Sequence, residues 1–196
     1  MKTELVPLII GIGGTALPNS STEQALRVAL DAAEAAGART RIFGGAVLAG
    51  LPHYLTPACI TSEDGKALVA AAREADGVII ASTGYHGSIS GLLKNGLDYL
   101  EVMSKDERVY IDGLPVGLIT TAYGWQAGAS TLAALRTIVH ALRGYPTPFG
   151  ASLNSAGGLF NDGECIQPAA KEQLEFVGRQ VVQYARMSQG VRQKAG

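Results

Sequence analysis

Short apolar segments alternate with stretches of helical periodicity along the chain, and this alternation constrains the fold more than any other feature. Each connection between successive apolar segments is long enough to hold a helix, and parallel strands need such crossovers. Helices then cover both faces of the sheet, so the pattern predicts an α/β protein with three layers. We predict five strands, at residues 5–12, 38–44, 77–82, 115–121 and 147–152.

The intervening segments predict the helices. Residues 22–36 place small and apolar side chains on one face, and similar patterns occur at 63–75, 128–142 and 168–187, with a further helix after residue 91. We expect residues 45–62 to form a loop and residues 104–113 to form a polar surface excursion. Because crossovers are right-handed, five such strands fit the flavodoxin-like order 2-1-3-4-5, a doubly wound parallel sheet. Its ligand crevice lies at the carboxyl ends of strands one and three.

Composition limits the possible classes of partner. The 196 residues fit a single domain at 1–190, with a frayed tail at 191–196. A formal net charge of −1 gives no indication of nucleic-acid binding. The apolar run near the N-terminus is too short to span a membrane and has no cleavage pattern. We therefore expect a cytoplasmic protein without a membrane partner.

The histidines and cysteines do not form a recognisable metal motif. His53, His86 and His140 share no ligand spacing with Cys59 or Cys165, so we assign no metal site. Two cysteines far apart in sequence favour free thiols in a reducing compartment, with a disulfide as the alternative.

The loop after the first strand carries a cluster of polar side chains directly before a helix. Hydroxyl donors and free N–H groups at a helix N-terminus form an anion site, so we predict that this loop binds a phosphate. The alternative is that one hydroxyl simply caps the helix, which would account for one residue of the cluster. The predicted phosphate-binding residues are Thr15, Asn19, Ser20, Ser21 and Thr22.

Other nucleotide motifs fit this loop poorly. Gly11, Gly13 and Ala16 match the loose dinucleotide fingerprint, but the helix begins late and no acidic residue ends the second strand. The chain contains neither a Gly-Lys-Ser/Thr phosphate loop nor a Gly-x-Ser-x-Gly nucleophile motif.

The loops after the third and fourth strands predict contact with a flat ring. Glycines allow close approach of the backbone, whose N–H and C=O groups pair with the polar edge of such a ring. One phosphate loop and two ring-binding loops at one crevice describe FMN. Tyr85 as a half-buried loop aromatic and His86 as a solvated loop residue are the structural alternatives. The predicted ring-binding residues are Thr83, Gly84, Tyr85, His86, Gly87, Ser88, Thr121, Ala122, Tyr123, Gly124 and Trp125.

These loops resemble the NAD(P)H-dependent FMN reductase family, flavodoxin-like proteins that reduce flavins, quinones, azo dyes or chromate. The family's phosphate motif, Gly-Ser-x-Arg-x-x-Ser, corresponds to Gly-Thr-Ala-Leu-Pro-Asn-Ser at residues 14–20. Its ring motif, Thr-Pro-x-Tyr-x-Gly-Ser-x-x-Gly-x-Leu-Lys-Asn-x-x-Asp, corresponds to residues 82–98, with Thr83 in place of the proline. The third motif matches residues 121–125 by position only.

The resemblance implies a reductase in which hydride passes from NADH or NADPH to flavin N5. Electrons would then reach a quinone, metal, dye, oxygen or a partner flavin-dependent monooxygenase. The flavin carries the chemistry, so no catalytic side chain is assigned. Tyr85, His86, Tyr123 and Trp125 would shape the nicotinamide side. The family also implies a homodimer or homotetramer, for which residues 45–62 and 101–113 are candidate interface segments.

One departure from the motif, one pair of charged residues and two alternatives qualify this expectation. Leu17 occupies the position of the family's arginine, which predicts weaker FMN binding. Lys94 and Asp98, four residues apart on a helix, are expected to pair with each other rather than to act in catalysis. The first alternative is a flavodoxin-like electron carrier or FMN-binding module that does not oxidise NAD(P)H. The second is a regulatory or scaffold protein that has lost its flavin.

Overall fold

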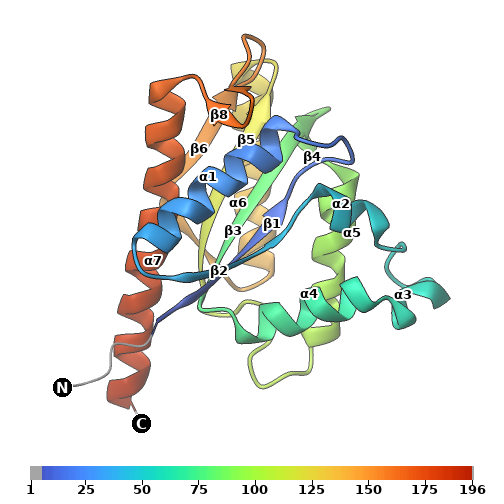
Figure 1. Ribbon diagram of the computed structural model, residues 1–196. Coiled ribbons are helices and arrows are strands. Elements are labelled where there is room, and N and C mark those ends of the chain that lie inside the picture. The colour runs from blue at the N-terminus through green and yellow to red at the C-terminus, as the bar shows by residue number, and fades with distance from the viewer. Residues whose placement is uncertain (1–5, 196) are drawn as a thin grey trace.

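A computed structural model describes the backbone of residues 6–195 and the side chains of residues 6–189. Five parallel strands form the central sheet in the order β2-β1-β3-β5-β6, which confirms the predicted order 2-1-3-4-5 (Figure 1). The short strand β4 (Ser88–Ile89) adds an antiparallel pair to the end of β3. The five parallel strands are β1 (Leu8–Gly13), β2 (Arg39–Phe43), β3 (Gly77–Tyr85), β5 (Pro115–Ala122) and β6 (Tyr145–Asn154).

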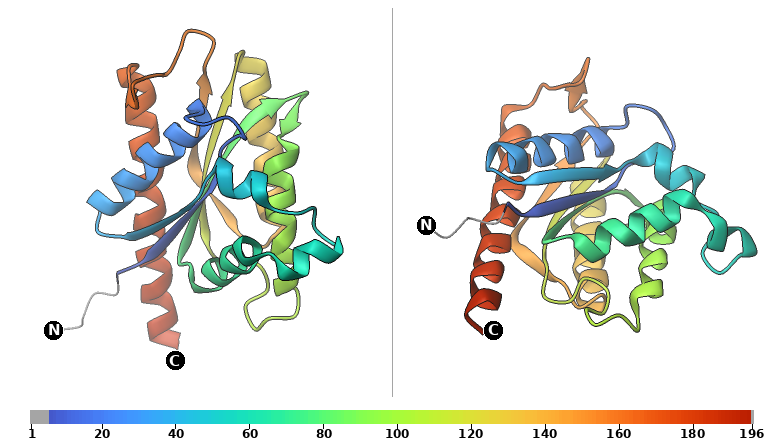
Figure 2. Two further views of the ribbon diagram at one scale, coloured as in Figure 1. Left: turned by 45° about the vertical axis from the view of Figure 1, so that its right-hand side comes forward. Right: turned by 60° about the horizontal axis from the view of Figure 1, so that its bottom comes forward.

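Helices cover both faces of this sheet and make the predicted three layers (Figure 2). One face packs on α1 (Ser21–Ala35) and α7 (Pro168–Ala195). The other face packs on α4 (Glu63–Glu74), α5 (Gly91–Asp98) and α6 (Trp125–Ala141).

The alternation of side chains along each strand supplies both cores. Ile79 of β3 joins the cluster beneath α1 and α7, whereas the next residue, Ile80, joins the cluster on the opposite face. Both side chains are almost completely buried. A strand buried on both faces is an uninterrupted apolar run, which is why the strand pattern was readable in the sequence.

Serine caps define where three helices begin. The hydroxyl oxygens of Ser20, Ser62 and Ser90 each accept a hydrogen bond from the backbone N–H three residues later, at the starts of α1, α4 and α5. Such caps satisfy an N–H that has no acceptor within the helix. The predicted starts at residues 22 and 63 are therefore correct to within one residue.

The prediction that residues 45–62 form a loop is wrong, because this segment contains the short helices α2 (Gly45–Gly50) and α3 (Pro57–Thr61). These helices have five or six residues, too few for a clear periodic pattern. The segment 104–113 is not entirely a surface excursion either, because Ile111 is buried in the core.

Several elements are longer than the sequence pattern predicts. β6 begins two residues earlier and ends two residues later than expected, and the helical backbone of α7 continues past residue 187. A 3-10 helix, η1 (Tyr99–Met103), extends α5. The hairpin of β7 (Phe160–Asn161) and β8 (Glu164–Cys165) was not predicted, because strands of two residues carry no period.

Three further observations concern the described residues. Cys59 and Cys165 are both free. Between residues 6 and 195, no helix has the length and apolar character that crossing a bilayer requires. The expected start of the first strand, at residue 5, lies outside the described residues.

Helices α1 and α7 approach each other closely at Gly178. A Cβ atom added there would lie 2.0 Å from the carbonyl oxygen of Ala29 and 3.2 Å from Cβ of Ala32. The first of these neighbours is backbone, which cannot move without shifting α1. Glycine is therefore required at this crossing for a steric reason.

We predict that Gly178→Ala destabilises the protein by about 1–3 kcal/mol, as overpacking usually does. At a helical glycine with free space around it, the same substitution would instead stabilise the protein by about 0.5–1 kcal/mol. Urea unfolding measures the difference. Gly50→Ala is the matched control, because a Cβ there meets nothing within 4 Å. Equal or greater stability of Gly178→Ala would contradict the close approach.

Candidate functional site

The carboxyl ends of β1, β3 and β5 lie side by side at one edge of the sheet, at the top of Figure 1. Gly13 pairs with Ala81, and Thr83 pairs with Thr121. The three predicted loops therefore start from adjacent strands. This register brings together segments that are about a hundred residues apart in sequence.

In the first loop, polar side chains organise the chain before α1. The Thr15 hydroxyl accepts a hydrogen bond from the Leu17 N–H at 3.2 Å, and the Ser20 hydroxyl accepts from the Glu23 N–H at 3.3 Å. The Ser20 bond is the helix cap that the sequence left open as an alternative. Since a hydroxyl also has a proton to donate, capping leaves Ser20 able to donate to an anion. Ser21 is half-buried, and Asn19 is exposed in a left-handed conformation with φ of 53°.

Thr22 is placed differently from the rest of this cluster. Its side chain is 2% exposed, and its hydroxyl lies 2.6 Å from that of Thr121, which is 3% exposed. The pair joins the first turn of α1 to the end of β5. Thr22 and Thr121 therefore tie the first loop to the third, with their hydroxyls turned to each other inside the protein.

The second loop is a tight hairpin rather than a direct passage from strand to helix. Tyr85 of β3 pairs with Ser88 of β4 across His86 and Gly87, which have φ of 50° and 83°. Two successive residues with positive φ make the turn that suits a twisted two-residue hairpin. The Thr131 hydroxyl of α6 lies 2.8 Å from the Ala127 carbonyl and 3.2 Å from the Ser88 carbonyl, so its one proton is shared between its own helix and the hairpin.

The third loop is shorter than predicted, because α6 begins at Trp125 rather than at residue 128. Ala122 ends β5 in a buried position, and its carbonyl accepts from the Ser155 N–H. Gly124 precedes the helix and has no side chain to cap it. The first backbone N–H groups of α6 therefore have no side-chain acceptor at the cap position, at the same edge as the start of α1.

Three large aromatic side chains are exposed at this edge. Tyr85 is 54% exposed, Tyr123 is 85% exposed and Trp125 is 68% exposed. Exposed rings of this size bury 150–250 Å² each when covered, so they provide flat apolar surfaces for a ligand. Thr83 and Gly84 are half-buried, with Gly84 paired to Ile89 in the hairpin, and His86 lies exposed at the turn.

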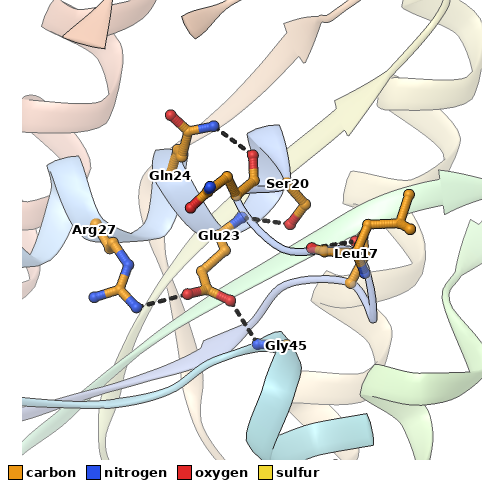
Figure 3. Close-up of polar contacts among 8 residues, drawn as sticks. Leu17, Ser20, Glu23, Gln24, Arg27 and Gly45 are labelled. Carbon is orange, nitrogen blue, oxygen red and sulfur yellow. Dashed lines mark hydrogen bonds and ion pairs between the residues drawn. The ribbon is translucent and has the colours of Figure 1, made fainter. Parts of the chain in front are cut away.

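Glu23 is a residue of this region that the sequence reasoning missed. Its carboxylate accepts from the Gly45 N–H at 2.7 Å and pairs with Arg27 at 2.6 Å, as Figure 3 shows. The pattern Ser20-x-x-Glu23 is that of a capping box, in which the glutamate would return to the N–H of the cap residue. Here it reaches the start of α2 instead, a partner that only the tertiary structure supplies.

The prediction that Lys94 and Asp98 pair with each other is confirmed. Lys94 and Asp98 of α5 form an ion pair. Among the described residues, no group of three or more histidine, cysteine or acidic side chains is placed to hold a metal ion.

An apolar hollow lies away from the sheet edge, beside α3, α4 and η1. It is a mainly apolar cavity of about 420 Å³. The side chains of Leu55, Ile60 and Val102 line it and are 82%, 74% and 52% exposed. Burial raises the pKa of Tyr99 in its wall, and the Tyr99 hydroxyl donates to the Pro52 carbonyl.

Comparison with known proteins gives a family match over most of the chain. The sequence model of a family described as NADPH-dependent FMN reductase matches residues 7–157, which include all three loops. The FMN-dependent NADPH-azoreductase of Staphylococcus saprophyticus is 42% identical over 77 residues, 39% of this chain and 37% of that protein. The azoreductase of Staphylococcus haemolyticus is 33% identical over 104 residues, 50% and 52% of the two chains. The chain thus spans 37% to 52% of the length of these relatives.

Solved structures share the fold. The flavoenzyme FerB, an NAD(P)H:(acceptor) oxidoreductase from Paracoccus denitrificans, superposes with a TM-score of 0.71 at 18% identity, covering 93% of this chain and 99% of that one. The apo form of the NADH:FMN oxidoreductase EMOB gives 0.65 at 21% identity, covering 93% and 90%. At such identities the likeness shows the fold alone.

We predict that the hydroxyls of Thr22 and Thr121 are energetically coupled. Thr22→Val leaves the Thr121 hydroxyl buried without its partner, which costs about 1–3 kcal/mol. In the double valine variant no hydroxyl is left unpaired, so its loss should be smaller than the sum of the two single losses. Chemical denaturation of all four proteins measures this. Thr137→Val removes an exposed hydroxyl and serves as the control; strictly additive losses would mean that the pair does not interact.

Proposed function

Because the chain belongs to the NADPH-dependent FMN reductase family, as its motifs predicted, we propose that it oxidises NADPH using FMN held at the carboxyl edge of the sheet. The observation that carries this proposal is the convergence of three loops on adjacent strands. One ends in a helix N-terminus with hydroxyl side chains, and the other two carry exposed aromatic rings.

The first loop fits the phosphate end of FMN. Thr15, Ser20 and Ser21 offer hydroxyl donors, Asn19 offers an exposed amide, and the first N–H groups of α1 have no acceptor within the helix. The helix dipole favours an anion at this position. We propose that these groups hold the phosphate, while Thr22 positions the loop through Thr121.

The second and third loops fit the ring end. A Cβ added at Gly87 or Gly124 would meet nothing within 4 Å, so both backbone segments face open space. We propose that N–H groups of residues 84–88 and 123–124 face the polar edge of the ring and stabilise negative charge there. Tyr85, His86, Tyr123 and Trp125 would cover the nicotinamide and exclude water.

Bound FMN supplies the redox chemistry, since it accepts hydride from a nicotinamide and passes electrons on. The role left to the chain is therefore to orient the two rings and to fix their polar edges. NADPH is proposed as the donor rather than NADH, with support from the description of the family and from the printed names of the azoreductases. The proposed acceptors are quinones, azo dyes, metal oxyanions, oxygen or a partner monooxygenase; the exposed rings support a flat acceptor.

The decisive experiment follows nicotinamide absorbance in air after adding FMN and NADPH to purified protein. Oxidation that requires both protein and FMN supports the reductase, and a parallel assay with NADH gives the nucleotide preference. FMN binding without any oxidation would instead favour the electron carrier or flavin-binding module.

We predict that Leu17→Arg tightens FMN binding about ten-fold or more, because a charge-assisted hydrogen bond contributes about 1.5–3 kcal/mol. Leu17 is 73% exposed, so the longer side chain fits without disturbing the core. Equilibrium titration of flavin fluorescence gives the dissociation constant. Met187→Arg adds the same charge at an exposed site of α7, outside the three loops and the proposed interface, and is the control. An unchanged dissociation constant in Leu17→Arg would contradict the prediction that the missing arginine weakens FMN binding.

We also propose a homodimer or homotetramer that uses residues 45–62 and 101–113. Leu55, Ile60 and Val102, the exposed apolar side chains of the apolar hollow beside α3, α4 and η1, fall within these segments. Ile60→Asp is predicted to lower the mass in solution, measured by light scattering, because a charge would be buried without a partner. Ile166→Asp, at an exposed site outside both segments, should leave the mass unchanged. A monomeric wild-type protein would contradict this proposal.

A further inference from the structure

The first turn of α1 already carries a negative charge of its own. Glu23 is the acidic residue of that turn, three positions after the Ser20 cap. A carboxylate near a helix N-terminus interacts favourably with the dipole, in the same way that a bound phosphate does. The negative charge of Glu23 therefore offsets part of the positive potential at this end of the helix. The proposed phosphate site depends on the same potential.

The Glu23 carboxylate is held in place on two sides. One oxygen accepts from the Gly45 N–H at 2.7 Å, and the other pairs with Arg27 at 2.6 Å. Its side chain is 17% exposed, whereas the Arg27 side chain is 55% exposed. Glu23 cannot swing into solvent without breaking both contacts, so its charge stays beside the loop.

The same ion pair engages the cation that is nearest to the loop in sequence. Arg27 is the only lysine or arginine between residues 6 and 38. Its guanidinium is bonded to Glu23 (Figure 3). Both side chains line a cavity of about 530 Å³ together with Asn19 of the loop. With Leu17 in the loop, residues 14–22 themselves offer a phosphate only neutral hydroxyl, amide and backbone donors.

We propose that Glu23 is a specificity-determining residue that weakens recognition of the flavin phosphate, so that the preference for FMN over riboflavin is about three-fold or more smaller than it would be without this charge. The inference rests on the proposed function and names its substrate class more closely: flavins with or without the 5′-phosphate. Glu23 also has a structural role, because its carboxylate connects α1 to the start of α2. The same carboxylate therefore stabilises the fold and weakens the binding of a phosphate.

The test compares the dissociation constants of FMN and riboflavin for the wild type and for Glu23→Gln. The variant should bind FMN about three-fold or more tightly, the effect of one charge near a helix terminus, and riboflavin within about two-fold of the wild type. It should also unfold at a lower temperature, because the Arg27 ion pair is lost. The gain in FMN affinity should shrink in about 1 M salt, where the Debye length is about 3 Å.

Two further variants separate charge from structure. Glu34→Gln removes a carboxylate at the far end of α1 and should leave the ratio of the two dissociation constants unchanged. Arg27→Gln leaves the charge of Glu23 unpaired and should therefore weaken FMN binding more than riboflavin binding. This variant tests the inference even if Glu23→Gln does not fold.

The outcomes distinguish this inference from the proposed function. If the wild type binds FMN but the ratio is the same in Glu23→Gln and Arg27→Gln, the inference fails and the proposed function stands. A ratio that moves in the opposite direction also overturns the inference. If the wild type binds neither flavin, the proposed function fails together with the inference.

Discussion

The parallel register of β1, β3 and β5 is the constraint on which the site depends. Each of these strands is buried between two helical layers, and a one-residue slip would exchange the side chains of its two faces. The cores therefore fix the register, and the register brings three carboxyl ends to one edge. The loops that follow these strands therefore lie beside one another at that edge.

Local devices then shape the edge. Ser20 fixes the start of α1, the His86–Gly87 turn folds the second loop back on β3, and the Thr131 hydroxyl of α6 shares its proton with that hairpin. The buried pair of Thr22 and Thr121 connects the first loop to the third. These contacts are formed within the protein itself, so the loops are largely organised before a ligand is present. Preorganisation of this kind reduces the cost of ordering on binding.

Electrostatics distinguish the first loop from the arginine-bearing motif of the resembled family. Leu17 supplies no cation, and the ion pair with Glu23 engages Arg27, the nearest cation in sequence. An anion at this loop would therefore meet helix dipoles and neutral donors from residues 14–22. Sites of this kind hold a phosphate less tightly than sites that include a guanidinium, because charge-assisted hydrogen bonds are the stronger ones.

The sequence by itself determined the layers, the strand order and the three loops, because buried parallel strands are uninterrupted apolar runs and their loops lie between periodic segments. It also found the motifs of residues 14–20 and 82–98, which identified the family. It did not find α2, α3 or the hairpin at residues 160–165, since such short elements carry no period. Only the tertiary structure decided that Thr22 turns to Thr121 and that Glu23 reaches Gly45. Their partners lie 99 and 22 residues away, and no local pattern encodes contacts made by chain packing.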